Sequence, residues 1–288
     1  MRPGWLAAPL LGAVLAGGTM HAQEPDFETT RIADGVYRFR YRAHNAFFVV
    51  TSEGIVAFDP ISPTAADRYA AEIERVAPGS RLRAIVYSHR HADHASGAAV
   101  LRRALGVDVP IIAHANAREP IRAAGDTNLP PPDVTFEERL TLHFGDRAIE
   151  LHYLGKSHSD DMLVALLPED RIAFAVDFAS HDGIGYRDLG SFHFPDQFTA
   201  LERLLALEFD VIVFGHGPVG DRHSVERQIG YYSDLREAVQ SAVERGWSED
   251  EAAERVRLPT YETWGGYDSW FPLNVRGMYR WLVRDRAR

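Results

Sequence analysis

The chain has 288 residues, 45% of them hydrophobic, so it can bury the core of one large domain or of two small ones. Its formal net charge of −10 argues against nucleic acid or an anionic membrane surface as a partner, because phosphate groups are bound by clustered cations. The absence of cysteine excludes disulfide bonds, thiolate metal ligands and a catalytic thiol, and it is compatible with an oxidising compartment.

Residues 1–22 have the pattern of a secretory signal peptide. Arg2 precedes an uncharged run from Trp5 to Gly18, and a candidate cleavage site ends at Ala22, before a polar segment. The apolar run is shorter than the ~20 residues that a membrane-spanning helix needs. We therefore expect cleavage near Ala22 and a periplasmic or secreted protein.

The rest of the chain alternates between strand-like and helix-like patterns, as expected of an α/β protein. Strands are expected at 36–41, 45–51, 55–58, 83–87, 138–144, 148–154, 162–167, 171–176 and 211–214, and helices at 65–76, at 97–105 and beyond Ser224, with a last periodic segment at 275–283. The proline-rich segment 126–133 cannot be helix or central strand, so it separates two halves of one domain or covers a cleft. We expect a main domain at 23–223 and a helical extension, 224–288, packed on it.

Five apolar runs end in a histidine or an aspartate. These residues are Asp59, His89, His158, Asp177 and His216. In open α/β sheets, ligands gather at the carboxyl ends of strands, where loops and helix N-termini face one crevice. The recurrence predicts a site that is assembled from several strand ends.

The segment 88–94, Ser-His-Arg-His-Ala-Asp-His, concentrates His89, His91, Asp93 and His94 within six residues. A helix would place His89 and His91 about 200° apart around its axis, whereas a loop between a strand and a helix can turn all four side chains inward. Imidazole and carboxylate ligands without thiolate suit zinc, and also iron or manganese. The segment therefore predicts a binuclear metal site.

Together these motifs resemble those of the metallo-β-lactamase superfamily of binuclear metallohydrolases. The resemblance covers roughly 36–220 and includes Asp59, the 88–94 segment, Gly-Lys-Ser-His at 155–158, Asp177 and Gly-His-Gly-Pro at 215–218. It implies an αβ/βα sandwich of two mixed β-sheets flanked by helices, to which this chain adds a C-terminal helical tail. It also makes 23–223 the hydrolase domain.

The resemblance implies a role for each motif residue. One metal would be bound by His89, His91 and His158, and the other by Asp93, His94 and His216. Asp177 would bridge the two metals, and Asp59 would orient the ligand loop. A hydroxide bridging two zinc ions would attack an acyl carbon, with Asp93 as the catalytic residue that orients it and shuttles its proton, because metal coordination lowers the pKa of water to about 7.

We therefore expect an exported zinc-dependent hydrolase acting on a small-molecule ester, thioester, lactone or related amide. Aspartate at 177 resembles the glyoxalase II and lactonase branches, because zinc β-lactamases usually carry cysteine or no ligand there. The chain departs from the lactonases, which have a tyrosine where Ser180 stands. It also lacks a match to the cationic glutathione-binding residues of glyoxalase II.

Three alternatives stay open. A β-lactamase is the main one, because the targets of β-lactams lie in the compartment that an export signal implies. An iron-dependent persulfide dioxygenase resembles the fold but binds one iron through two histidines and one aspartate. A tRNA-processing ribonuclease shares the motif, although the acidic balance argues against it.

Other residues are candidates for lesser roles. Lys156, His181 and His193 are candidates for substrate contact. The remaining histidines are expected to be solvated or structural: His44, His114, His143, His152 and His223. The aromatic segment 261–271 either packs on the sandwich, which we favour, or forms a wall of the substrate pocket or a dimer contact.

Overall fold

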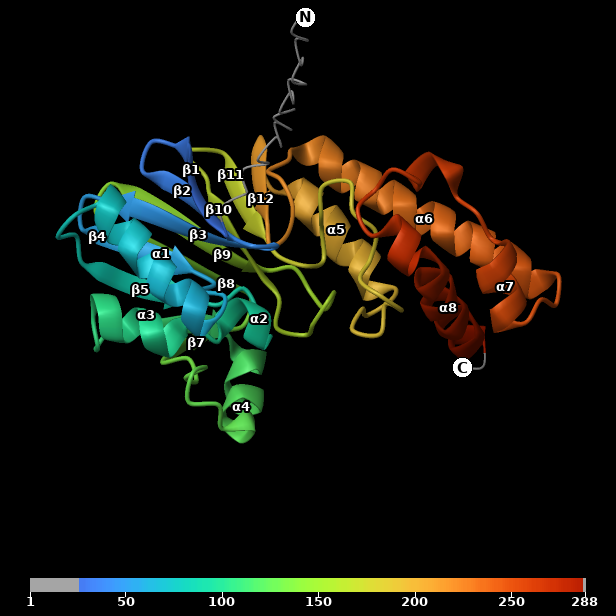
Figure 1. Cartoon of the computed structure of the whole chain (residues 1–288), viewed down its shortest axis with the longest axis horizontal. Coiled ribbons are helices and arrows are strands. Elements are labelled where there is room, and N and C mark those ends of the chain that lie inside the picture. The colour runs from blue at the N-terminus through green and yellow to red at the C-terminus, as the bar shows by residue number, and fades with distance from the viewer. Residues whose placement is uncertain (1–25, 287–288) are drawn as a thin grey trace, which may run out of the picture.

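Two β-sheets pack face to face, with helices on their outer sides (Figure 1). The computed structural model describes residues 26–286, so the predicted signal peptide lies outside the described residues. In Figure 1, α1, α3 and α4 lie on one side of the molecule, and α5 to α8 form the opposite side. This is the sandwich of two mixed sheets that the sequence predicts.

The first sheet has seven strands in chain order. Its first four strands pair antiparallel, and the last four pair parallel from β4 to β7. The strands are β1 (Phe27–Ala33), β2 (Val36–Tyr41), β3 (His44–Thr51), β4 (Gly54–Phe58), β5 (Leu82–Val86), β6 (Ile111–His114) and β7 (Val134–Phe136).

The second sheet has five strands in the order β12-β11-β10-β9-β8. Only β11 and β12 run parallel, and the other neighbours are antiparallel. The strands are β8 (Arg139–Phe144), β9 (Arg147–Tyr153), β10 (Leu163–Leu167), β11 (Ile172–Ala175) and β12 (Val211–Phe214).

Three of the described helices begin at side-chain caps that are typical of helix N-termini. Ser62 caps α1 with a proline at its first position, and Asp221 and Ser248 form capping boxes at α6 and α7. The helices are α1 (Pro63–Val76), α2 (Ala92–Ala95), α3 (Ala98–Leu105), α4 (Ala115–Ala124), α5 (Asp196–Ala206), α6 (Arg222–Glu244), α7 (Glu249–Arg255) and α8 (Tyr267–Arg286), with a 3₁₀ turn, η1, at Pro259–Tyr261.

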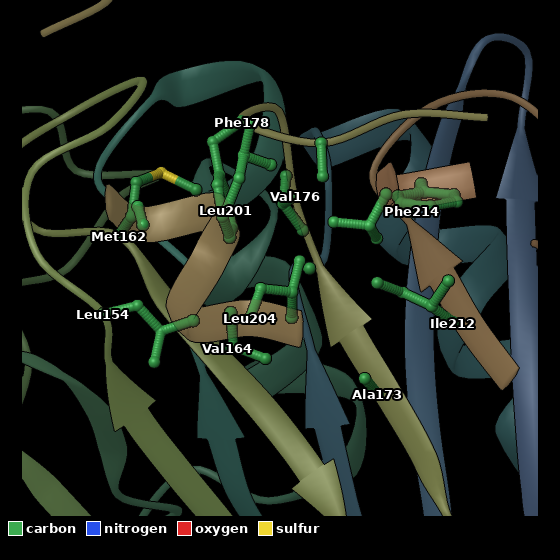
Figure 2. Close-up of a cluster of buried hydrophobic side chains, with 14 of the residues drawn as sticks. Leu154, Met162, Val164, Ala173, Val176, Phe178, Leu201, Leu204, Ile212 and Phe214 are labelled. Atoms are coloured by element: carbon green, nitrogen blue, oxygen red, sulfur yellow. The ribbon is translucent and has the colours of Figure 1, made fainter. Parts of the chain in front are cut away.

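The hydrophobic core fills the space between the sheets and continues under the helices. Phe174 of β11 stacks on Phe47 of β3 with ring centroids 5.3 Å apart, which joins the two sheets. Figure 2 shows Leu201 and Leu204 of α5 packed over the second sheet. Helices α6 and α8 bury Leu235 and Val275, among others, in the same cluster, while α1 and α3 cover a second cluster on the first sheet.

Two features of the loops differ from expectation. Asp93 and His94 lie in the four-residue helix α2, so the 88–94 segment is not wholly a loop. The proline-rich segment 126–133 lies between α4 and β7, before the last strand of the first sheet, and none of its residues lines the cleft. Tyr87 donates a hydrogen bond to the Pro130 carbonyl (3.1 Å), which fixes the segment beside the end of β5. In the part of the chain that the structure describes, no helix is long and apolar enough to cross a membrane.

Candidate metal centre

A buried carboxylate anchors the loop that follows β5. Asp59, directly after β4, accepts hydrogen bonds from the backbone N–H of Ser88 (2.7 Å) and from its hydroxyl (2.6 Å). Asp59 is fully buried and has a φ of 46°, a backbone conformation in which aspartate is one of the better tolerated residues. The ends of two parallel strands are thereby tied together at the start of the ligand loop.

The first cluster consists of His89, His91, His158 and Asp177, whose candidate ligand atoms all lie within 4.8 Å of one another. His89 is buried, and His158 comes from the loop after β9. Their Nε2 atoms lie 3.5 Å and 3.4 Å from Asp177 Oδ2. The cluster joins residues from three strand ends, as the sequence predicts.

The second cluster consists of His44, Asp93, His94 and His216, whose candidate ligand atoms also lie within 4.8 Å of one another. His94 Nε2 lies 3.2 Å from Asp177 Oδ1, and His216 Nε2 lies 3.1 Å from the same oxygen. Asp177 therefore directs one oxygen at each cluster, which is the arrangement that a bridging carboxylate requires.

These spacings fit metal ions. Two ligands of one tetrahedral zinc ion, each about 2.0–2.1 Å from it, lie about 3.4 Å apart. In the described part of the chain, the buried atoms His89 Nε2, His94 Nε2 and Asp177 Oδ1 have no hydrogen-bond partner. Buried polar atoms are rarely left unpaired, so a cation at each cluster would satisfy them.

Contacts outside the clusters orient the rings. The Ser88 hydroxyl lies 3.0 Å from His89 Nδ1, and the Ala43 carbonyl lies 2.9 Å from His216 Nδ1. Asp59 Oδ2 lies 3.6 Å from His94 Nδ1. The first two contacts hold one nitrogen of His89 and of His216 and leave the other facing a cluster, which is how proteins fix the tautomer of metal-binding histidines. At 3.6 Å, Asp59 acts on His94 through its charge and not through a hydrogen bond.

The electrostatics of the site favour cations. Burial lowers the pKa of His89 well below its usual range and that of His158 to about 4, so both imidazoles are neutral, the form that binds metal. Burial opposes charge on His94 as well, but the carboxylate of Asp177, with Asp59 and Asp93, raises its pKa to about 9. In the absence of a metal ion, His94 is therefore protonated, and its positive charge balances the nearby carboxylates.

The pKa values of the two buried carboxylates, Asp59 and Asp177, are shifted in opposite directions. Burial raises the pKa of Asp59 to about 6. Burial also disfavours charge on Asp177, yet His94, His216 and His89 hold its pKa well below the usual range. Asp177 is therefore ionised and available to bridge.

An ion pair joins the ligand loop to the loop of His158. The Arg90 guanidinium contacts Asp160 and donates to Asp161 Oδ1 (2.7 Å), and its backbone N–H donates to Asp161 Oδ2 (2.8 Å). Asp161 is fully buried. The two loops that supply the first cluster are thus fixed to each other.

A cleft of about 1460 Å³ opens over both clusters. Its lining includes Arg38, Arg40 and Arg42, from β2 and the turn after it, and the aromatic residues Tyr186 and Trp270. The rings of Tyr186 and Trp270 make an edge-to-face contact with centroids 4.9 Å apart. The cleft therefore presents both cations and aromatic surface.

The aromatic segment 261–271 packs on the domain and also borders the cleft. Tyr261 and Trp264 pack on Tyr231 of α6, with ring centroids 5.1 Å and 5.8 Å away. Gly265, Gly266 and Trp270 line the cleft.

The three candidates for substrate contact are placed differently. His181 lines the cleft, and its Nδ1 lies 2.8 Å from the Ser224 hydroxyl. Lys156 and His193 are exposed, and neither is among the residues that line the cleft. Charge and proximity to His158 in the chain suggested Lys156, and a place in the loop 178–195 after Asp177 suggested His193, but neither residue lines the cleft.

Sequence reasoning missed His44 as a site residue. It assigned His44 a solvated or structural role, yet the side chain lies in the second cluster. The sequence pattern that indicates a ligand is an apolar run followed by a histidine or an aspartate, whereas His44 begins an antiparallel strand. Such a strand brings its first residue, not its last, to the edge where the parallel strands end.

A family model described as the metallo-beta-lactamase superfamily matches residues 40–216, more than half of the chain. The chain belongs to the metallo-β-lactamase superfamily. The match contains both clusters and Asp59.

Superfamily relatives with different names are similar to this chain. Metallo-beta-lactamase type 2 of Bacillus cereus is 26% identical over 183 residues, which cover 62% of this chain and 68% of that protein. Hydroxyacylglutathione hydrolase of Anaeromyxobacter dehalogenans is 34% identical over 116 residues, 40% of this chain and 39% of that protein. Type A flavoprotein fprA of Rhodobacter capsulatus is 28% identical over 202 residues, 62% and 46% of the two chains.

A solved structure, the metallo-beta-lactamase from Pontibacter korlensis, shares the fold with a TM-score of 0.61 over 71% of this chain and 97% of that chain, at 22% identity. Membership of the superfamily and the named hydrolase relatives identify this protein as a metal-dependent hydrolase. The relatives differ in the substrates that their names imply.

Proposed function

We propose that the protein is an exported zinc-dependent hydrolase with two metal ions, acting on a small-molecule ester, thioester, lactone or related amide. The observation that carries this proposal is Asp177, whose two oxygens face two separate histidine clusters at 3.1–3.5 Å. One carboxylate shared in this way neutralises part of the repulsion between two nearby cations. A single-ion site would leave one of these clusters without a use.

The residues of this chain divide the work. His89, His91 and His158 would hold one ion, Asp93, His94 and His216 the other, and Asp177 both. Bound zinc polarises carbonyl groups and lowers the pKa of a coordinated water from 15.7 to about 7. We assign to Asp93 the orientation of the attacking water and the acceptance of its proton, because its side chain is 56% exposed and borders the cleft beside His94.

The cleft supports a substrate with an anionic part and an apolar part. Arg42 is 67% exposed and has only Asp26, at 4.0 Å, as an ion-pair partner within residues 26–286. Tyr186 and Trp270, which also line the cleft, offer ring surface. We expect a substrate that contacts the metal clusters together with these cationic and aromatic groups.

The test is hydrolysis by zinc-loaded protein lacking residues 1–22, assayed with a chromogenic ester, a thioester, an acyl lactone and a chromogenic β-lactam. A chelator should abolish turnover, and metal analysis should find two zinc ions per chain. His89→Ala and His158→Ala should lose both activity and metal. His152→Ala, which removes a ring paired with Glu150 (2.9 Å), is the control and should keep both; equal losses from all three variants would contradict the site assignment.

A β-lactamase is the second candidate, favoured by the relatives from Bacillus cereus and Bacillus sp. that carry this name. Chelator-sensitive opening of the β-lactam, with no turnover of the other substrates, would establish it. One iron per chain in place of two zinc ions would instead favour persulfide dioxygenase chemistry, and two iron or manganese ions would change the metal but not the site.

Export is part of the proposal and has its own test. The full chain, expressed in a bacterium with a periplasm, should be recovered there with its mature N-terminus near Gln23. Recovery of the uncleaved chain from the cytoplasm would contradict it.

A further inference from the structure

His44 lies against both histidines of the second cluster. Its ring centroid is 4.6 Å from that of His216 and 5.5 Å from that of His94. Its Nε2 lies 3.4 Å from Asp93 Oδ2, and its side chain is only 27% exposed. The histidine at the start of β3, an inner strand of the first sheet, therefore faces the site.

The backbone holds His44 firmly in this place. His44 forms a β-bridge with His216, and the N–H of the buried Asn45 donates to the Gly215 carbonyl (2.8 Å). The Asn45 amide donates to the Phe214 carbonyl (2.8 Å) and to that of Gly217 (2.9 Å). The start of β3 is thus tied across the sandwich to the loop that carries His216.

The same segment serves His216 directly. The Ala43 carbonyl lies 2.9 Å from His216 Nδ1 and so directs its Nε2 toward Asp177. Two consecutive residues, Ala43 and His44, therefore contact the second cluster, one through its backbone and one through its ring.

The spacing of His44 matches that of the other candidate ligands. Its Nε2 lies 3.4 Å from Asp93 Oδ2, within the 3.1–3.5 Å that separate the histidines of the two clusters from the Asp177 oxygens. The candidate ligand atom of His44 also lies within 4.8 Å of those of Asp93, His94 and His216.

We propose that His44 is an additional protein ligand of the second metal ion. This inference rests on the two-ion site of the proposed function. With His44, each ion receives three imidazoles, and the second ion also receives Asp93. His44 would then raise the affinity of the second ion and leave that of the first unchanged.

The experiment measures metal binding and not turnover. Metal-free protein without residues 1–22 is titrated with Co²⁺, whose visible absorption reports ligand number, and the two dissociation constants are obtained by competition with a chelator. His44→Ala should raise the dissociation constant of the second ion at least tenfold and lower the absorption of Co²⁺ bound there. The dissociation constant of the first ion should stay within twofold of that of the unaltered protein. His44→Gln, which keeps the size of the side chain, should do the same and covers the case that the alanine variant fails to fold.

Two further variants calibrate the result. His216→Ala should also weaken the second ion, and His223→Ala, which removes an exposed ring beside Glu226, should change neither ion. If both His44 variants bind the second ion like the unaltered protein while His216→Ala does not, the proposal is overturned. Binding of two ions with this pattern but without hydrolysis of any tested substrate would leave His44 a ligand and refute the proposed function alone.

Discussion

The most informative substitution outside the clusters is Asp59→Asn. Asp59 is not among the residues that line the cleft, but it accepts two hydrogen bonds from Ser88 and lies 3.6 Å from His94 Nδ1. The substitution keeps the shape and one acceptor oxygen, while it removes the charge and one of the two bonds. It therefore separates the electrostatic role of Asp59 from its role as a spacer.

The structure predicts a small effect on stability and a larger one on metal binding. Loss of one hydrogen bond to a charged group costs about 1.5–3 kcal/mol. Removal of the charge offsets much of this loss, because burial makes the ionised carboxylate unfavourable and raises its pKa from 3.8 to about 6. The free energy of unfolding of the metal-free protein at pH 7.5 should therefore change by no more than about 1 kcal/mol.

Metal affinity should fall clearly. Loss of a carboxylate that supports a metal-binding histidine typically costs 10–100-fold, about 1.4–2.7 kcal/mol. We expect a loss of this size for the second ion, whose ligand His94 faces Asp59. The measurements are urea unfolding of the metal-free protein and zinc competition with a chromophoric chelator.

A matched control is Asp146→Asn. Asp146 also accepts a backbone hydrogen bond, from Ser52 (2.9 Å), but it is exposed and far from the clusters in the fold. It should leave zinc affinity unchanged. Unaltered zinc affinity in Asp59→Asn would refute the reasoning, because Asp59 would then be only a structural bridge to Ser88.

Three other predictions concern the support of the site. Gly97→Ala should destabilise the protein by about 1–3 kcal/mol and weaken zinc binding, because a Cβ there would lie 2.2 Å from the Pro60 carbonyl oxygen. Urea unfolding measures the stability, and chelator competition measures the zinc affinity. The control Gly230→Ala, whose Cβ would have its nearest contact at 3.6 Å, should not destabilise the protein. Phe174→Ala should cost about 3–5 kcal/mol in unfolding free energy, because its ring joins the two sheets, and a loss below 1 kcal/mol would contradict this packing. Zinc binding at pH 7.5 should release about one proton from His94, whose pKa is about 9, and the release should decline as the pH rises through 9. Calorimetry in two buffers of different ionisation enthalpy measures the number of protons released. If no proton is released, His94 is neutral before the metal binds.

Much of the site could be predicted because parallel strands place their carboxyl ends at one edge. Asp59, His89, Asp177 and His216 each follow an apolar run, and the structure brings all four to that edge. The strand pattern also predicted most of both sheets. The expected elements did not include β1, β6, β7, α2, α4 or α5. Most of these are short or polar, and α4 contains a proline, whereas α5 has an apolar face that the sequence analysis did not use.

The sequence by itself determined the chemistry: which side chains can bind metal, and that several of them follow strands. Only the tertiary structure decided which residues share an ion and which face the cleft. His44 joins the second cluster because an antiparallel strand returns its first residue to the ligand edge, and Arg42 reaches the cleft through the turn after β2. Both placements depend on how the two sheets face each other, a long-range relation that no local pattern of residues records.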